Sequence, residues 1–180
     1  MAKKGKINLK KELSKNQTLL LIVPSIDYND IVVDMAKQLS GKNLCYVTLN
    51  KTYDSLIELF DKNKINTKKM MFIDAISRTL KKVPDKTANC YFVSSPASLT
   101  ELSITITNLL NKKFDYLIFD SITSLSIYQK KEPVTKFVSS IINKIKESET
   151  KAIFYALKVK EQEELLKECC MFTDKVSELK

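Results

Sequence analysis

Short, wholly apolar segments alternate with amphipathic ones along most of this chain, and that alternation strongly limits its fold. The segments at 18–23 and 115–120 lack the polar alternation of a half-exposed strand, so we expect both faces of each to be buried. Between such segments lie stretches with helical spacing, the clearest at 134–145. Strands that alternate with helices are joined by crossovers. The sequence therefore predicts an α/β fold, a three-layer α/β/α sandwich around a mainly parallel central sheet.

The expected elements follow from the same patterns. Strands are predicted at 18–23, 44–49, 70–73, 91–93, 115–120 and 152–157, and helices at 28–39, 53–61, 99–110, 134–145 and 161–171. Gly41 is expected to end the first helix, and Ser98 with Glu101 has the spacing of a capping box. Residues 74–89 are expected to form an exposed excursion. Residues 1–16 are predicted to be a basic, frayed lead-in, and residues 17–180 a single domain.

The net charge of +9 comes from lysine, since Arg78 is the only arginine. A lysine-rich surface attracts polyanions without specificity. Groove readers and phosphate clamps favour arginine, because its planar fork binds two acceptors at once. The charge therefore predicts weak, non-specific polyanion contact rather than a dedicated reader.

Several classes of site are excluded by residues that these 180 positions lack. There is no histidine, so histidine-based acid–base or triad chemistry is excluded. The four cysteines show no C-x-x-C spacing, so we expect no zinc or other metal site. No apolar run approaches a membrane span, and the first 15 residues do not resemble a secretory signal. Thiols without a disulfide pattern fit a reducing compartment, so the expected location is the cytoplasm.

The connection after the first predicted strand is where nucleotide-binding α/β folds place a glycine-rich phosphate cradle. This chain has only two glycines, Gly5 and Gly41, and neither lies there. Pro24 removes one N–H donor, and Asp27 is expected to cap the following helix. A carboxylate repels a phosphate charge by ~1 kcal/mol at about 4 Å in water and ~4 at an effective dielectric near 20. The helix N-terminus attracts a phosphate by only ~0.3–1 kcal/mol per charge. Repulsion by the carboxylates is therefore expected to outweigh this attraction.

The ordered set of segments resembles the RecA/KaiC-type ATPase core common in archaea, over roughly residues 18 to 172. The residues that carry the resemblance are the strand and helix at 18–39, Phe-Ile-Asp-Ala-Ile at 72–76 and Phe-Asp-Tyr-Leu-Ile-Phe-Asp-Ser-Ile at 114–122. The last segment resembles a Walker B strand, with Asp120 followed by Ser121. The resemblance implies a P-loop ATPase ancestry and a RecA-like fold.

Three departures from the family pattern imply a degenerate member. The G-x-x-x-x-G-K-[ST] loop, the Walker A motif, is absent, and bulky Tyr28 stands where the backbone should be bare. Asn50 and Lys51 occupy the place of the family's glutamate pair, and neither is a carboxylate base. The resemblance thus leaves a vestigial nucleotide site without catalytic residues or cofactor. Its residues are Pro24, Ser25, Asp27, Asn29, Asp30, Asp120 and Ser121.

For Asp120 the sequence favours a structural role, as a cap for the turn at 121–124 or as an acceptor for Ser25. The favoured function is a non-catalytic, protein-interacting or regulatory domain, with a paralogue or a second copy of the chain as partner. One alternative is a residual nucleotide binder or weak ATPase, and another is a basic nucleic-acid-associated protein. A receiver-like phosphoacceptor at Asp120, with Lys158 beside it, is a more distant alternative.

Overall fold

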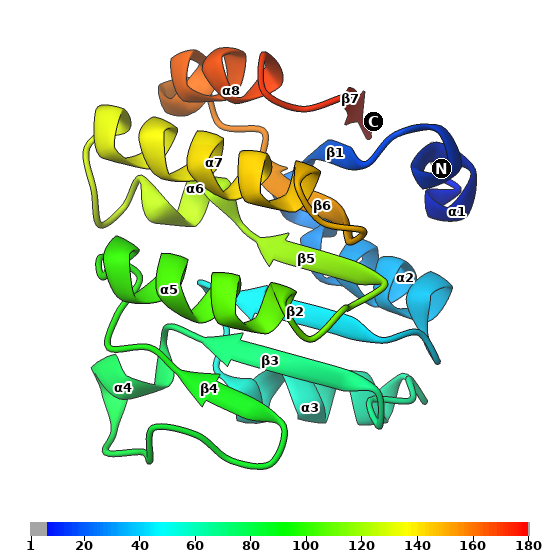
Figure 1. Cartoon of the computed structure of the whole chain (residues 1–180), viewed down its shortest axis with the longest axis vertical. Helices are drawn as coiled ribbons and strands as arrows, with labels where there is room; N and C mark the ends of the chain where they lie inside the picture. The colour runs from blue at the N-terminus through cyan, green and yellow to red at the C-terminus, as the bar shows by residue number, and fades with distance from the viewer. Residues whose placement is uncertain (1–6, 180) are drawn as a thin grey trace.

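The computed structural model describes residues 7–179 and folds as a three-layer sandwich (Figure 1). The strands are β1 Thr18–Val23, β2 Leu44–Thr48, β3 Met70–Asp74, β4 Cys90–Phe92, β5 Tyr116–Asp120, β6 Lys151–Leu157 and β7 Lys175–Glu178. The helices are α1 Leu9–Lys15, α2 Tyr28–Leu39, α3 Tyr53–Lys62, α4 Ser77–Leu80, α5 Leu99–Leu110, α6 Ile122–Leu125, α7 Lys131–Lys146 and α8 Glu163–Cys170. Two 3-10 turns, η1 Ser25–Asp27 and η2 Lys160–Gln162, precede α2 and α8.

The sheet has the strand order β4-β3-β2-β5-β6-β1-β7, and every pair of neighbours is parallel. Helices α1, α2 and α3 cover one face, while α5, α7 and α8 cover the other (Figure 1). The predicted three-layer α/β/α fold is confirmed. The structure places β1 between β6 and β7, so the carboxyl ends of β1, β6 and β5 meet at one edge of the sheet.

The central strands are apolar throughout because successive side chains enter opposite cores. In β5, Leu117 and Phe119 pack among residues of α5 and α7, whereas Ile118 packs on the side of α2 and α3. All three side chains are fully buried. This double burial is the physical reason why the strand pattern at 115–120 shows no polar alternation.

The beginning of the described chain is more ordered than expected. Residues 9–15 form α1, which Asn8 caps by accepting the N–H of Lys11 at 3.0 Å. Leu9 and Leu13, four residues apart, are buried in the core beside α2. The expectation of a frayed lead-in is therefore wrong for this segment, because two leucines on one helical face outweigh the lysines around them. Residues 1–6 lie outside the described range.

Two local predictions around helix ends have different outcomes. Gly41 follows α2 with a φ of 82°, as a helix stop requires, so that prediction is confirmed. The capping box at Ser98 is wrong, because Ser98 makes no side-chain cap bond to α5. Its hydroxyl instead lies 3.2 Å from that of Ser95, and Glu101 accepts the N–H of Ser94 at 3.0 Å. The side chains of Ser98 and Glu101 therefore bond the turn before α5 and not the first N–H groups of the helix.

The excursion at 74–89 is exposed from Lys81 to Lys86 apart from half-buried Val83, as predicted, but it begins with the short helix α4. Asp74 explains that helix: its buried carboxylate accepts the N–H of Ile76 at 2.7 Å and of Ser77 at 2.8 Å. Across residues 7–179, no helix combines the length and the apolar character needed to cross a bilayer.

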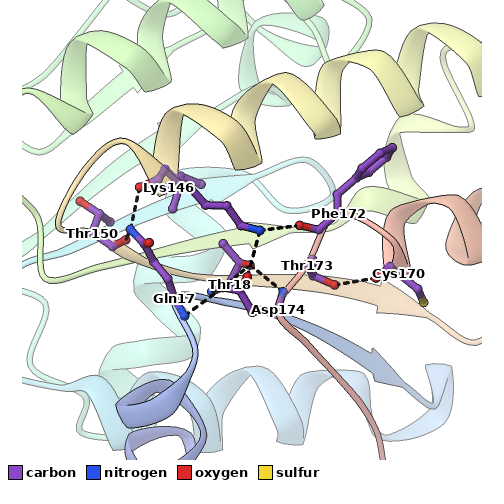
Figure 2. Close-up of polar contacts among 9 residues, drawn as sticks. Gln17, Thr18, Lys146, Thr150, Cys170, Phe172, Thr173 and Asp174 are labelled. Atoms are coloured by element: carbon purple, nitrogen blue, oxygen red, sulfur yellow. Dashed lines mark hydrogen bonds and ion pairs between the residues drawn. The ribbon is translucent and has the colours of Figure 1, made fainter.

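Strand β7 was not predicted, because Lys-Val-Ser-Glu carries no strand signal. Asp174, just before it, holds the start of β1 in place. Its carboxylate accepts the N–H of Gln17 at 3.1 Å and both the N–H (2.9 Å) and the hydroxyl (3.0 Å) of Thr18, and Lys146 pairs with it at 2.9 Å. Figure 2 shows these groups pointing toward one another from β1, α7 and the segment before β7. The Asp174 carboxylate therefore connects the start of β1 to the segment before β7.

Asp174→Asn is expected to lower the free energy of unfolding at pH near 7 by about 2 kcal/mol, because the amide accepts fewer bonds and loses the charge that Lys146 faces. Burial alone would raise the pKa of Asp174, but the bonds from Lys146 and Thr18 outweigh it and lower the pKa. A lowered folded pKa stabilises the fold above the unfolded value near 4, and this stability is lost as pH falls through the folded pKa. The difference between variant and wild type should therefore shrink in acid.

Urea denaturation at neutral and acidic pH measures this difference. Glu147→Gln, at an exposed acid, is the control and should leave the unfolding free energy nearly unchanged. A deficit for Asp174→Asn that stays constant from neutral pH to acid would show that the charge of Asp174 does not stabilise the fold.

Candidate functional site

Asp120, the last residue of β5, lies at the carboxyl edge of the sheet and is fully buried. Its side chain points to the same face as that of Ile118, two residues earlier, which is the face covered by α2 and α3. Tyr46 lies on the neighbouring strand β2, where it pairs with Ile118. Tyr155 lies on β6, the other neighbour of β5. The strand order thus brings a carboxylate and two phenols together.

Three side chains donate hydrogen bonds to the Asp120 carboxylate. The hydroxyl of Tyr46 donates to Oδ2 at 2.6 Å, and the hydroxyl of Tyr28 donates to Oδ1. The amide of Asn50 donates to the same Oδ1 at 3.1 Å and to the Tyr28 hydroxyl at 2.7 Å. Most of the acceptor positions of the carboxylate are therefore filled by the protein itself.

The turn after β2 fixes Asn50 in this arrangement. The N–H of Leu49 donates to the carbonyl oxygen of Asp120 at 2.7 Å, and the hydroxyl of Thr48 donates to the carbonyl of Lys51 at 2.7 Å. The ammonium of Lys51 then lies 5.8 Å from the ring centroid of Tyr28, within range of a cation–π contact. Asn50 and Lys51 together cover the outer side of Tyr28.

Burial dominates the electrostatics of this cluster. It raises the pKa of Asp120, although the bonds from Tyr28, Tyr46 and Asn50 and the charge of Lys51 act to lower it. Burial, with the nearby Asp120, also raises the pKa of both Tyr28 and Tyr46. Both phenols therefore stay protonated and act as donors. The cluster contains neither an activated nucleophile nor an accessible base.

Tyr155 completes the cluster from β6. Its hydroxyl is buried and has no hydrogen-bond partner among the described residues. Burial, followed by the charge of Asp120, raises its pKa. Tyr155 thus resembles Tyr46 in burial but not in bonding.

The segment between β1 and α2 consists of Pro24 and a single 3-10 turn. Pro24 has no N–H, and residues 25–27 form the turn η1, with the N–H of Tyr28 donating to the carbonyl of Ser25. Asp27 precedes α2 but makes no capping bond, so the predicted cap is wrong. Its backbone, at φ −100° and ψ 5°, is not extended as a capping residue requires. Ile26 is 93% exposed at the tip of the turn.

The predicted site residues differ in burial. Asp120 and Ser121 are fully buried, Pro24 and Asp27 are half-buried, and Ser25, Asn29 and Asp30 are exposed. The turn after β5 is capped by Ser121, which accepts the N–H of Ser124 at 3.3 Å, and not by Asp120. Ser25 does not donate to Asp120 either, because the donors to the Asp120 carboxylate are Tyr28, Tyr46 and Asn50. Both expected partnerships of Asp120 are therefore wrong.

Sequence reasoning missed that Tyr28, Tyr46 and Asn50 belong to one cluster with Asp120. The strand pattern at 44–49 predicts no partner for the Tyr46 hydroxyl, and the sequence indicates Tyr28 only as a bulky residue at the phosphate loop. A phenol in the middle of an apolar strand was the available signal, since a buried tyrosine hydroxyl usually finds a partner.

Three protein donors already bond the carboxylate of Asp120. A cation would have to displace Tyr28 and Asn50 from Oδ1 of Asp120. Among residues 7–179 no group of three histidine, cysteine or acidic side chains could hold a metal. Lys158, proposed as the partner of a phosphoacceptor, pairs with Glu178.

Comparisons with known proteins bear on the fold. No protein-family model matches the sequence, and no curated protein matches it. Among solved structures 100 chains match. One is a KaiC-like protein from the hyperthermophilic archaeon Pyrococcus horikoshii OT3, with a TM-score of 0.53 and 12% sequence identity. The match covers 78% of this chain and 61% of that chain, less than two thirds of its length. At this identity the likeness shows a RecA-like fold and nothing of activity.

Proposed function

We propose that this chain is a non-catalytic RecA/KaiC-like domain of archaeal type, which works in the cytoplasm as a protein-interaction or regulatory module. The observation that carries the proposal is that protein donors enclose the carboxylate of Asp120. Its carboxylate is fully buried, and donors from α2, β2 and the following turn surround it. An ATPase of this fold needs an acid there that reaches magnesium and water.

The segment at 24–28 supports the same proposal. A phosphate cradle needs several backbone N–H groups pointing into one concave space. Here Pro24 lacks an N–H, and that of Tyr28 is used within the turn. The missing Walker A loop and the hydrogen bond from Tyr28 to Asp120 are related. The phenol of Tyr28 fills space that a glycine-rich backbone would leave open.

Exposed apolar side chains at the carboxyl edge favour a protein partner. Ile26, Leu80 and Ile127 are 93%, 71% and 76% exposed, and they follow β1, β3 and β5. Large apolar side chains exposed on the loops of one edge support an interaction surface there. The first partner to test is a second copy of the chain, and a catalytically active paralogue is the second.

Isothermal titration with ATP, ADP and magnesium tests the loss of nucleotide binding. We expect no heat of binding for the wild type at millimolar nucleotide. Sedimentation velocity then tests association: Ile26→Asp with Ile127→Asp should abolish self-association, while Met171→Asp, exposed near the end of α8, should not. Micromolar ATP binding would contradict the loss of nucleotide binding. Equal behaviour of the two variants would contradict an interface at the carboxyl edge.

A further inference from the structure

Six exposed lysines lie together at the opposite, amino-terminal edge of the sheet. They belong to three loops, 40–43, 63–69 and 111–115, which lead into β2, β3 and β5. These strands are neighbours in the order β3-β2-β5, so the loops start within about 10 Å of one another. We call this group the amino-edge patch: Lys42, Lys64, Lys68, Lys69, Lys112 and Lys113.

Backbone hydrogen bonds hold the three loops to one another. The N–H of Leu44 donates to the carbonyl of Lys69 at 3.0 Å, which joins the first loop to the second. The N–H of Asp115 donates to the carbonyl of Asn43 at 2.9 Å, and the Asp115 carboxylate accepts the N–H of Asn43 at 2.9 Å. The lysines therefore project from one connected backbone rather than from independent loops.

The positive charge of the amino-edge patch is poorly compensated. The three loops contain one acidic residue, Asp115, whose carboxylate is already bonded within them. None of the six lysines forms an ion pair with another residue in the described range 7–179. Lys112 contacts the hydroxyl of Tyr91 at 3.0 Å and helps to lower its pKa. On the side of β6, Glu147 and Glu149 mark the limit of the patch.

Helix stability does not account for these lysines. Attraction to the helix dipole is confined to the last turn, where α2 and α3 already carry Lys37 and Lys62. The patch lysines all lie beyond those turns. Lys64 and Lys113 have φ values of 56°, a left-handed conformation that favours glycine, and the position after α2 that is equivalent to Lys64 is Gly41. The chain thus keeps lysine at two positions where the backbone disfavours it.

We propose that the amino-edge patch binds the phosphodiester backbone of a nucleic acid without reading its bases. Lysines from three adjacent loops can neutralise several phosphates of one strand, and the absence of arginine from the loops removes the fork that reads guanine. An anionic membrane is a poorer fit, because the large exposed apolar side chains of the described chain lie outside these loops. This inference goes beyond the proposed function and concerns the opposite edge of the sheet.

Fluorescence anisotropy with a labelled single strand of mixed sequence, about 20 nucleotides long, and with its duplex tests the proposal across about 50 to 200 mM salt. We expect sequence-independent binding that weakens with salt, with a log–log slope near −3 for the single strand if four or five lysines contact phosphates. Lys42→Gln, Lys68→Gln and Lys69→Gln together should weaken binding at least tenfold and reduce the slope by about 2. The side chains of these three lysines form no ion pair within residues 7–179, and their φ values are ordinary, so the fold should persist.

The matched control removes the same charge at the carboxyl edge, with Lys82→Gln, Lys130→Gln and Lys160→Gln, all at exposed positions. Its affinity should stay within about threefold of the wild type. Equal losses in the two triple variants would overturn the location, and no binding by the wild type at low salt would overturn the proposal. Tighter, patch-dependent binding to phosphatidylserine vesicles than to either oligonucleotide would assign the patch to membranes and also overturn it.

Discussion

Tyr46→Phe is expected to lower the free energy of unfolding by about 2 kcal/mol, although it removes a single oxygen atom. The phenol donates at 2.6 Å to a fully buried carboxylate, and a hydrogen bond to a charged group contributes about 1.5–3 kcal/mol. Phenylalanine keeps the ring contacts with Phe60 and Phe72, so the core volume is preserved. Urea denaturation at neutral pH measures the difference.

Tyr155→Phe is the matched control, since Tyr155 is equally buried but its hydroxyl has no partner in the described chain. Removing an unbonded buried hydroxyl leaves nothing unsatisfied, so the unfolding free energy should stay within about 0.5 kcal/mol or rise. If both variants lost the same stability, ring packing rather than the bond to Asp120 would be the cause.

Asp120→Ala should destabilise the fold by about 3 kcal/mol, because it leaves the Tyr46 hydroxyl buried without an acceptor and frees Tyr28 and Asn50. Asp120→Asn keeps one acceptor and removes the ionisation, so it should be milder. Thermal or urea unfolding of both variants at several pH values separates the loss of bonds from the loss of charge.

The pH dependence of Asp120→Asn has a definite sign. Burial raises the folded pKa of Asp120 above its unfolded value near 4, so its contribution to stability is greatest below that value. The contribution is lost as pH rises through the folded pKa. The variant should therefore compare better with the wild type at mildly alkaline pH than in acid. A trend of opposite sign for Asp120→Asn would refute a raised pKa.

The layers of the fold were predictable because burial on both faces leaves a mark on every central strand. Residues 117–119 are wholly apolar and lie between Tyr116 and the closing Asp120, and the chain around them folds as that pattern indicates. The short elements α1 and β7 were not predictable from periodicity. In α1 only Leu9 and Leu13 show helical spacing, which spans a single turn. In β7 the segment Lys-Val-Ser-Glu is held in the sheet by its pairing with β1 and by Asp174.

The partners of Asp120 were beyond local reasoning for a different physical cause. Tyr28 is 92 residues away in sequence and Tyr46 is 74 away, and only the strand order brings them to the carboxylate. The sequence predicted a structural role for the acid and a blocked phosphate loop. It did not connect the two, because nothing in the local pattern shows that the blocking side chain is itself the donor.

The place of β1 in the strand order has a consequence for synthesis on the ribosome. Within residues 7–179 this strand pairs with β6 and β7 alone, whose residues are translated more than a hundred positions later. At about 5–20 residues per second, the nascent strand waits on the order of ten seconds for a neighbour. Its apolar side chains are then shielded by little more than α1 and α2. Chaperone engagement during translation should accordingly concentrate on the chain before residue 151 emerges.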